Sequence, residues 1–387
     1  MTNAKTNAKF QQLLDCGQSL WMDFLSRQIL ESGELKDWVE NRGLRGMTSN
    51  PTIFEKSMTG DETYRPAIEQ GIQQGLSATE IYEMLAFDDI RRACDTLRPI
   101  YDESDGLDGY VSIEVAPHLA RDMAGTMQEA RRFFREVDRD NVMVKIPGTL
   151  EGLGAIEQAI AEGINVNVTL LFSVEMYRQA AMAYIRGLEK RMEQGQPIDR
   201  IGSVASFFLS RIDTKVDDRL GDRLTHIGSD NLNEEKRLES VKGKVAIANA
   251  KVAYQTFLGL FEGDRWQRLA DQGANVQRLL WASTSTKNPE YSDVLYVDEL
   301  IGPHTVNTMP VETIEAFGDH GTINCNAVTT DVEQAQTLLN SLSDSDINID
   351  LDAVMDELLE EGIQKFVQPY DSLLQSLESR MKQLTTA

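Results

Sequence analysis

Cysteine and histidine are scarce in this sequence, and neither residue type is clustered. The 387 residues include three cysteines, Cys16, Cys94 and Cys325, which are far apart and form no CxxC pair. This pattern predicts a reducing compartment and no disulfide framework. The four histidines form no HxxxH or HxH cluster, so a histidine-rich metal site is not expected. There is no Walker A loop and no GxGxxG motif after a strand, and we expect no cofactor.

The sequence also lacks long apolar runs and a surplus of positive charge. Residues 1–10 contain no apolar signal core, and no run approaches the roughly 18 apolar residues of a membrane helix. The 38 Lys and Arg against 62 Asp and Glu give a formal net charge of −24. So much negative charge repels nucleic acid and anionic membrane surfaces. We therefore expect a cytoplasmic protein that binds neither, and that holds any anionic ligand in a local basic pocket.

Short β-rich apolar runs alternate with longer amphipathic segments along the chain. Eight strands are predicted, at residues 20–24, 44–48, 110–115, 142–146, 165–170, 203–208, 278–283 and 304–309. Helices are predicted between them, at residues 77–101 (opened by a Ser77–Glu80 capping box), 118–136, 150–162, 174–194, 210–222 and 233–272. This alternation indicates βα units and a parallel sheet. Eight repeats favour a closed (β/α)8 TIM barrel, with a doubly wound open sheet as the alternative.

The segment after the last predicted strand indicates additional C-terminal helices. We expect one domain over residues 1–387, with the barrel at about 15–318 and a helical extension at about 319–387. The extension is predicted to hold two or three helices, including 350–363 and 364–384. Pro369 is expected to kink or break the last of them, because proline lacks a backbone N–H.

Polar residues recur at the carboxyl ends of the predicted strands, where the active sites of barrels lie. In 165–170, Asn165, Asn167 and Thr169 share one face of the strand, which we expect to look into the barrel. Other polar side chains at or near strand ends are those of Asp23, Thr48, Asn50, Glu114, Lys145, Ser206 and Ser283. These side chains are therefore expected to converge on one cavity.

The chemistry suited to this set follows from Lys145, which comes directly after the apolar run 142–144. An amine held among apolar neighbours loses hydration and becomes neutral more readily. A neutral amine attacks a carbonyl to form an imine, and the protonated imine stabilises a carbanion at the adjacent carbon. Carbon–carbon bond cleavage then needs no metal, and nearby carboxylates can move the protons.

Each of these residues also has an ordinary structural interpretation. Lys145 could be a solvated strand end. Asp23 and Glu114 could pair with arginines or cap helices. Asn167 and Thr169 could form an internal hydrogen-bond ladder. Their common placement at the ends of barrel strands favours a functional site.

Several segments, in order along the chain, resemble the transaldolase family. They are Gly46-Met-Thr-Ser-Asn-Pro-Thr52, Val111-Ser-Ile-Glu-Val115, Val142-Met-Val-Lys-Ile-Pro147, Asn165-Val-Asn-Val-Thr-Leu-Leu-Phe-Ser173, Ser203-Val-Ala-Ser-Phe-Phe208 with Arg211, and Leu280-Trp-Ala-Ser283. The resemblance spans about residues 15–315 and is weaker in the C-terminal helices.

The resemblance implies a class I aldolase-type barrel with Lys145 as the Schiff-base lysine on the fourth strand. Asp23 would take the proton from the substrate hydroxyl as the carbon–carbon bond breaks. Glu114 and Thr169 would hold a water that relays protons during imine formation and hydrolysis. The substrate would be bound or enclosed by Asn50, Asn167, Thr48, Ser206 and Phe208.

The reaction that the resemblance implies acts on sugar phosphates. The family transfers dihydroxyacetone from sedoheptulose 7-phosphate to glyceraldehyde 3-phosphate, giving erythrose 4-phosphate and fructose 6-phosphate in the pentose phosphate pathway. Arg211 and Ser283 would bind the phosphate, although Arg211 could instead make a surface ion pair. The better-known branch has an arginine shortly after this serine, whereas this chain has Lys287 four residues later. We expect Lys287 to supply the charge.

Three other functions remain open. The first is a Schiff-base fructose 6-phosphate aldolase that releases free dihydroxyacetone, which the lack of a hydroxyl on Phe208 disfavours. The second is a non-catalytic sugar-phosphate-binding barrel, disfavoured by the complete set of Asp23, Glu114 and Lys145. The third is a metal-dependent aldolase, disfavoured by the scattered histidines. A homo-oligomer is compatible with the sequence.

Overall fold

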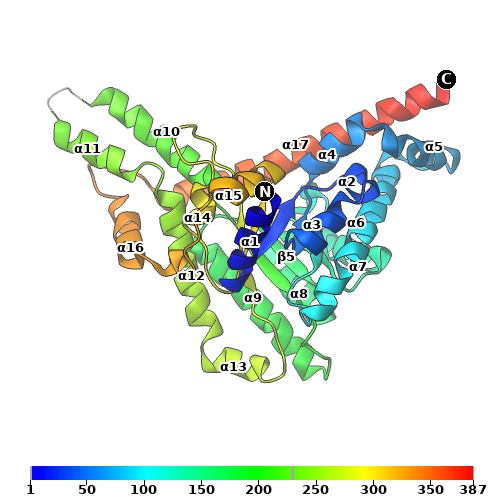
Figure 1. Ribbon diagram of the computed structural model, residues 1–387, viewed down its shortest axis with the longest axis horizontal. Coiled ribbons are helices and arrows are strands. Elements are labelled where there is room, and N and C mark those ends of the chain that lie inside the picture. Colours follow the sequence, from blue (N-terminus) through cyan, green and yellow to red (C-terminus); the bar gives the residue numbers. More distant parts are fainter. Residues whose placement is uncertain (1, 228–230, 387) are drawn as a thin grey trace.

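The eight strands form a closed parallel barrel in chain order, in which β1 pairs with both β2 and β8. The computed structural model describes residues 2–227 and 231–386, and Figure 1 shows the helices around the barrel. The strands are β1 (Gln18–Asp23), β2 (Gly46–Thr48), β3 (Tyr110–Glu114), β4 (Val142–Pro147), β5 (Val166–Leu171), β6 (Ser203–Phe208), β7 (Arg278–Ala282) and β8 (Thr305–Met309). The predicted (β/α)8 barrel is confirmed, and the open sheet is excluded.

The second strand is shorter than the predicted 44–48, because it begins only at Gly46. A Cβ at Gly46 would lie 2.4 Å from the Trp21 indole, so only glycine allows β2 to approach β1 this closely. Arg45 already donates its N–H to the Leu20 carbonyl at 2.8 Å, in the turn that enters the strand. The pairing of β1 with β2 brings Asp23 beside Thr48 at the carboxyl end of both strands.

The helices largely follow the predicted boundaries. The capping box is present, with the Ser77 hydroxyl accepting from the Glu80 N–H and the Glu80 carboxylate accepting from the Ser77 N–H. The helices are α1 (Thr2–Asp15), α2 (Arg27–Glu31), α3 (Glu34–Asn41), α4 (Pro51–Gly60), η1 (Glu62–Tyr64), α5 (Arg65–Gln73), α6 (Ala78–Glu103), η2 (Pro117–Leu119), α7 (Met123–Val137), α8 (Leu150–Glu162), α9 (Val174–Glu193), α10 (Ser210–His226), α11 (Leu232–Val241), α12 (Val245–Phe261), α13 (Asp264–Ala270), α14 (Leu295–Asp298), α15 (Val311–His320), η3 (Ala327–Thr329), α16 (Val332–Ser341) and α17 (Leu351–Thr386).

Two helical predictions are wrong. The segment 233–272 is not one helix but α11, α12 and α13, separated at Gly243, which has a φ of +68°, and at Gly263. The last helix, α17, is one continuous element of 36 residues that includes Pro369, so the predicted division into 350–363 and 364–384 is wrong. Proline removes one helical hydrogen bond, but Phe366 and Leu373 on either side of it are buried where α17 packs on the rest of the protein, chiefly on α4 and α6. Tertiary packing therefore outweighs the local preference to break.

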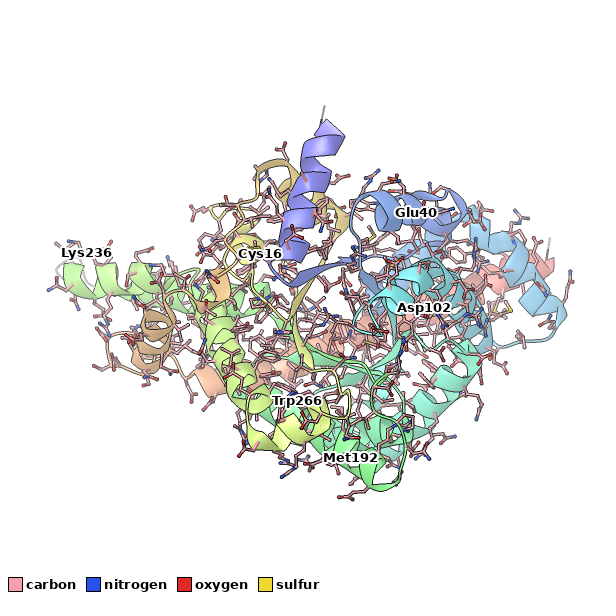
Figure 2. The ribbon with its side chains drawn as sticks, turned by 60° about the horizontal axis from the view of Figure 1, so that its bottom comes forward. Cys16, Glu40, Asp102, Met192, Lys236 and Trp266 are labelled. Atoms are coloured by element: carbon pink, nitrogen blue, oxygen red, sulfur yellow. A yellow bond between two sulfur atoms is a disulfide. The ribbon has the colours of Figure 1, made fainter. Side chains whose placement is uncertain are left out.

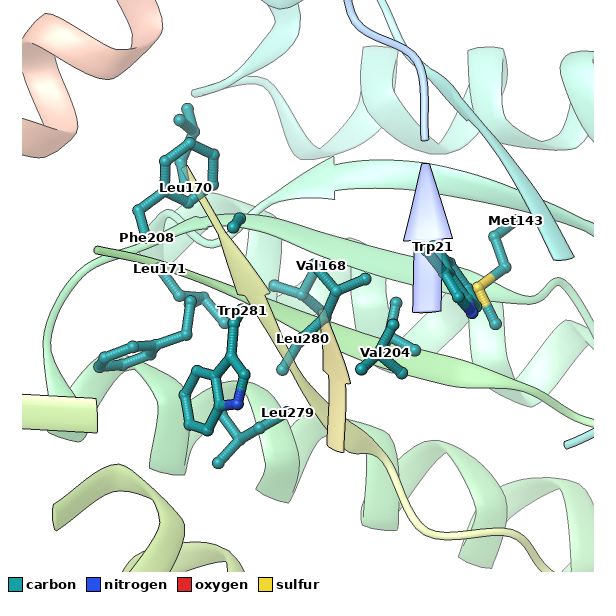
Figure 3. Packing of buried hydrophobic residues seen from close by; sticks show 14 of the residues in the cluster. Trp21, Met143, Val168, Leu170, Leu171, Val204, Phe208, Leu279, Leu280 and Trp281 are labelled. Atoms are coloured by element: carbon teal, nitrogen blue, oxygen red, sulfur yellow. The ribbon is translucent and has the colours of Figure 1, made fainter. Parts of the chain in front are cut away.

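Apolar packing between the strands and the surrounding helices holds the barrel from outside. Figure 3 shows Val168, Leu279 and Trp281 in this packing, and all three are fully buried. The rings of Phe207 and Trp281 meet edge to face, with their centroids 6.3 Å apart. Asn165, predicted to share the inward face of the fifth strand, lies just before β5. Asn165 donates to the Asp140 and Val142 carbonyls at the amino-terminal end of the strands, so it lies far from the carboxyl-end site.

Cys16 and Cys325 form a disulfide, which overturns the prediction of no disulfide framework. Their Cα atoms lie 4.9 Å apart, although 309 residues separate them in sequence. The bond ties the residue just before β1 to the segment after α15, and Figure 2 labels Cys16 at that junction. Cys94 is a free, buried thiol. Closure of the barrel brings the two half-cystines together, and sequence spacing alone carries no sign of it.

Loss of this bond is expected to destabilise the protein. Because a disulfide restricts the unfolded chain, Cys16→Ser should lower the free energy of unfolding by about 2–4 kcal/mol. Urea unfolding followed by circular dichroism, with and without reductant, measures the change. Reductant should destabilise the parent protein to the level of the variant and leave the variant unchanged. Equal midpoints for parent and variant without reductant would contradict the prediction.

The long helix α17 packs across the carboxyl-end side of the barrel. It contacts α4, α10 and β5, and Figure 1 shows it running beside α4. Ion pairs fasten it along its length, among them Lys215 with Glu357 and Glu361, and Arg380 with Glu62. None of the helices among residues 2–227 and 231–386 is long and apolar enough to cross a membrane.

Candidate active site

A cavity of about 720 Å³ opens at the carboxyl ends of the strands. Ten of the twelve predicted site residues line it, namely Asp23, Thr48, Asn50, Lys145, Thr169, Ser206, Phe208, Arg211, Ser283 and Lys287. The other two, Glu114 and Asn167, are buried just behind its wall. The tertiary structure thus brings together residues contributed by seven of the eight strands or by the segments that follow them.

Lys145 lies in β4 with only 5% of its surface exposed. Its Nζ donates to the Ser49 carbonyl at 3.1 Å and to Glu114 Oε2 at 3.3 Å. The register of β3 and β4 places Glu114 directly beside Lys145. The interpretation of Lys145 as a solvated strand end is therefore wrong, because the amine is sheltered and opens only to the cavity.

Two carboxyl groups share this end of the barrel with the amine. Burial raises the pKa of Asp23, and the Thr48 hydrogen bond and the charges of Lys145 and Arg211 only partly oppose this rise. Burial likewise raises the pKa of Glu114, against the charge of Lys145. Among the described residues, Glu114 Oε1 and the Thr169 hydroxyl are buried without a hydrogen-bond partner. Both atoms are free to bind a small polar molecule.

Thr308, a residue not predicted for the site, belongs to a hydroxyl chain that leads to Asp23. Thr48 Oγ1 donates to Asp23 Oδ1 at 2.6 Å, and Thr48 Oγ1 and Thr308 Oγ1 are 2.8 Å apart. Because Thr48 has a single hydroxyl proton, Thr308 acts as the donor in the second bond. Thr308 lies near the carboxyl end of β8, so the rule that identified the other residues would also have found it.

Asn167 makes hydrogen bonds inside the barrel wall. Its amide donates to the Ser112 hydroxyl at 3.0 Å and accepts from the Ser206 hydroxyl at 2.7 Å. The predicted alternative of an internal hydrogen-bond ladder therefore describes Asn167 correctly in this structure. Asn50 caps α4, since its side chain accepts from the Ile53 N–H at the start of that helix.

Three cationic side chains gather at the cavity. The Arg211 guanidinium lies 5.3 Å from the centroid of the Phe208 ring, and its Nη1 is buried without a partner among the described residues. Partial desolvation, together with the charges of Arg211 and Lys56, lowers the pKa of Lys287. Lys56, on α4, was not predicted. Such a cluster of positive charge in a chain of net charge −24 is suited to an anion.

The C-terminal helix contributes a further residue that was not predicted. Phe366 of α17 lines the cavity, and its ring centroid lies 5.6 Å from Lys145 Nζ. No sequence motif marks this phenylalanine, which resembles any other apolar residue of an amphipathic helix. No group of three or more His, Cys, Asp or Glu side chains that could hold a metal ion occurs in the described part of the chain.

Comparisons with known proteins agree on one family. The family model described as Transaldolase/Fructose-6-phosphate aldolase matches residues 20–377. The chain is 59% identical to Transaldolase 2 of a Nostoc species, over 97% of this chain and 98% of that protein. It is 54% identical to a transaldolase of Trichodesmium erythraeum and 44% identical to one of Mycobacterium tuberculosis, each over 97% of this chain and 98% of the relative. The chain therefore belongs to the transaldolase/fructose-6-phosphate aldolase family.

Proposed function

We propose that this chain is a transaldolase that moves a dihydroxyacetone unit between sugar phosphates through a Schiff base on Lys145. The observation that carries the proposal is the buried amine, held 3.3 Å from Glu114 and open to a cavity that Asp23 also lines. The proposed donor is sedoheptulose 7-phosphate, and the acceptor is glyceraldehyde 3-phosphate. The products, erythrose 4-phosphate and fructose 6-phosphate, place the reaction in the pentose phosphate pathway.

The first step needs a neutral amine on Lys145. Glu114 is the nearest proton acceptor, and the raised pKa of its carboxyl makes it a stronger base than an exposed glutamate. The amine then attacks the ketose carbonyl, and the carbinolamine loses water to give a protonated imine. Glu114 Oε1 and the Thr169 hydroxyl, buried without partners among the described residues, are available to hold the water that carries these protons.

Carbon–carbon cleavage needs a base at the substrate hydroxyl. Asp23 lines the cavity, and the raised pKa of its carboxyl suits it to accept a proton. As the hydroxyl gives up its proton to Asp23, the bond to the neighbouring carbon breaks and the electron pair moves into the imine. The aldose phosphate leaves, and the three-carbon enamine stays on Lys145. The acceptor aldehyde reverses these steps and takes the proton back from Asp23.

The cations at the cavity account for recognition of the substrate phosphate. Arg211, near the amino end of α10, has an unpartnered Nη1 and sits where the helix dipole also favours an anion. We assign Lys287 to the same phosphate, in place of the arginine found in the better-known branch, and Lys56 as an additional cation. Ser283 lines the same side of the cavity.

Transfer and simple aldol cleavage differ in what accepts the three-carbon unit. Phe208 lines the cavity beside Phe172, and it has no hydroxyl that could activate water there. We therefore favour transfer. The test supplies fructose 6-phosphate with erythrose 4-phosphate and measures sedoheptulose 7-phosphate. If free dihydroxyacetone accumulates equally fast when no acceptor is present, the chain is an aldolase instead.

The proposal predicts a shifted acid limb in the pH profile. Asp23 and Glu114 must be ionised to accept protons, and burial raises the pKa of both above their ordinary values of 3.8 and 4.5. As pH falls through these raised values, both carboxylates become protonated and kcat/KM should decline. Because kcat/KM reports groups of the free enzyme, it is the parameter to measure. An acid limb at or below the ordinary carboxyl range would contradict the prediction.

We further propose that the barrel and the C-terminal helices act as one unit, because α17 closes the site with Phe366. Phe366→Leu keeps most of the apolar volume but removes the ring that shields the Lys145 amine. We expect free dihydroxyacetone to form several-fold more often per transfer event, since water gains access to the imine. Val367→Ala, one residue away on the same helix, is the control and should behave as the parent. An unchanged ratio of release to transfer in Phe366→Leu would contradict this prediction.

We place the reaction in the cytoplasm, with sugar phosphates as the partners. The Cys16–Cys325 bond is unusual for a reducing compartment. Rapid alkylation of thiols during cell lysis, followed by peptide mapping, measures the state of both cysteines. Recovery of both as free thiols would support the cytoplasmic assignment, whereas quantitative recovery as a disulfide would count against it.

A further inference from the structure

The cavity loop between β7 and α14 carries Ser283, Ser285 and Lys287. At its start, Ser283 has a φ of +56°, which is uncommon for a residue with a Cβ. Its backbone carbonyl accepts from the Ser210 N–H at 3.1 Å, and the two hydroxyls lie 2.8 Å apart. This end of the loop is therefore fixed to the first residue of α10, next to Arg211.

The far end of the loop is attached to the same helix by two tyrosine–aspartate pairs, one partly buried and one fully buried. Tyr291 donates its hydroxyl to Asp217 Oδ2 at 2.7 Å. Tyr296, in α14, donates to Asp213 Oδ2 at 2.8 Å. The two aspartates are four residues apart on α10 and so lie on one face of it. Asp213 and Tyr296 are each only 1% exposed, so both partners of this pair are shielded from water.

The second oxygen of each aspartate is bound to the backbone at the start of α12. Asp217 Oδ1 accepts from the Gly243 N–H at 3.0 Å, and Asp213 Oδ1 accepts from the Ala246 N–H at 2.8 Å. Gly243 has a φ of +68°, and a Cβ there would lie 2.7 Å from the Tyr291 ring. The ring therefore packs directly on this glycine. Each aspartate is held by a backbone N–H and presents its other oxygen in a fixed direction to Tyr291 or Tyr296.

We propose that the Tyr291–Asp217 and Tyr296–Asp213 pairs are positioning residues that hold the Lys287 loop against α10, so that Lys287 and Arg211 meet the same substrate phosphate. This inference rests on the proposed function for the identity of the phosphate. Neither pair lines the cavity. The pairs act by fixing the segment that carries Lys287 to the helix that carries Arg211, and thereby set the distance between the two cations.

The test removes one hydroxyl and compares donors with and without a phosphate. Tyr291→Phe is expected to raise the KM for fructose 6-phosphate about 2- to 10-fold, the effect of one lost hydrogen bond. The kcat for this donor and the kcat/KM for unphosphorylated fructose should stay within about twofold of the parent values. Tyr254→Phe is the matched control, because Tyr254 donates to the Pro303 carbonyl at 3.0 Å and does not line the cavity.

A double-mutant cycle separates positioning from general stability. If the pairs act through Lys287, then Tyr291→Phe should have no further effect on KM in a Lys287→Met background. Additive effects, or equal losses with fructose and fructose 6-phosphate, overturn the proposal. Titration calorimetry with inorganic phosphate measures phosphate binding without turnover. Tyr291→Phe should weaken phosphate binding by a factor similar to the expected rise in KM. Unchanged phosphate binding would also overturn it.

Failure of this inference can be told apart from failure of the proposed function. Borohydride treatment with fructose 6-phosphate reports on the Lys145 Schiff base in every variant. If the parent is not labelled, the transaldolase mechanism fails, while the phosphate calorimetry still decides the positioning role. If the parent is labelled and Tyr291→Phe matches it in KM, only the positioning role fails.

Discussion

Lys145→Met is expected to abolish transfer, lowering kcat by at least about 10⁴-fold, because a covalent route has no substitute once its nucleophile is gone. Borohydride with fructose 6-phosphate should label the parent at Lys145 and leave the variant unlabelled. Methionine fills a similar volume to the lysine stem, so the barrel should remain folded. Circular dichroism and the urea midpoint check the fold in the same samples.

The matched control is Lys251→Met. Lys251 is as buried as Lys145, at 5% exposure, and it also has a carboxylate partner, Glu299, at 3.5 Å. It lies on α12 and does not line the cavity. This variant should retain transfer and borohydride labelling. Appreciable turnover by Lys145→Met, or labelling of another lysine in the parent, would refute the Schiff-base mechanism.

Asp23→Asn is expected to lower kcat by about 10²–10⁴-fold, the usual contribution of a positioned general base. The amide keeps the size of the carboxylate and still accepts from the Thr48 hydroxyl, but it cannot take the substrate proton. In the proposed mechanism imine formation relies on Lys145 and Glu114, so borohydride labelling should persist while transfer is lost. This combination distinguishes a base for carbon–carbon cleavage from a residue that merely supports the site.

A second buried aspartate serves as the control for Asp23. Asp108 accepts from Ser19, Trp21 and Arg278 at the amino-terminal end of the barrel, away from the cavity. Asp108→Asn should lower stability, since it weakens a buried ion pair, and leave kcat of the folded enzyme nearly unchanged. If Asp23→Asn loses labelling and transfer together, its role lies in substrate binding or imine formation and the assigned role is wrong.

Local sequence patterns were sufficient for the barrel and for most of the site. Each strand is a short, largely apolar run with a polar residue in or just after its carboxyl half, and this pattern is set by residues adjacent in the chain. Because parallel strands of a barrel end on one face, a residue such as Asp23 is placed beside Lys145 once the strand count is known. Thr308 follows the same rule, because it lies near the carboxyl end of β8.

Other features depend on contacts between segments distant in the chain. Pro369 would end an isolated helix, but the packing of α17 on the barrel keeps the helix continuous. Phe366 gains its place beside Lys145 only through that packing. Lys56 and Lys287 belong to segments of the chain far from Arg211. The fold brings the three cationic side chains close enough for their charges to interact.

The sequence alone determined the barrel, the sheltered lysine and the type of chemistry, because alternation of strands and helices and the polar strand ends are local properties of the chain. Only the tertiary structure decided that Cys16 bonds to Cys325, that Asn167 is engaged within the wall, and that Tyr291 and Tyr296 tie the cavity loop to α10. These features join residues far apart in sequence. These bonds form because the closed barrel brings distant segments of the chain within bonding distance. No local sequence pattern specifies which segments will meet.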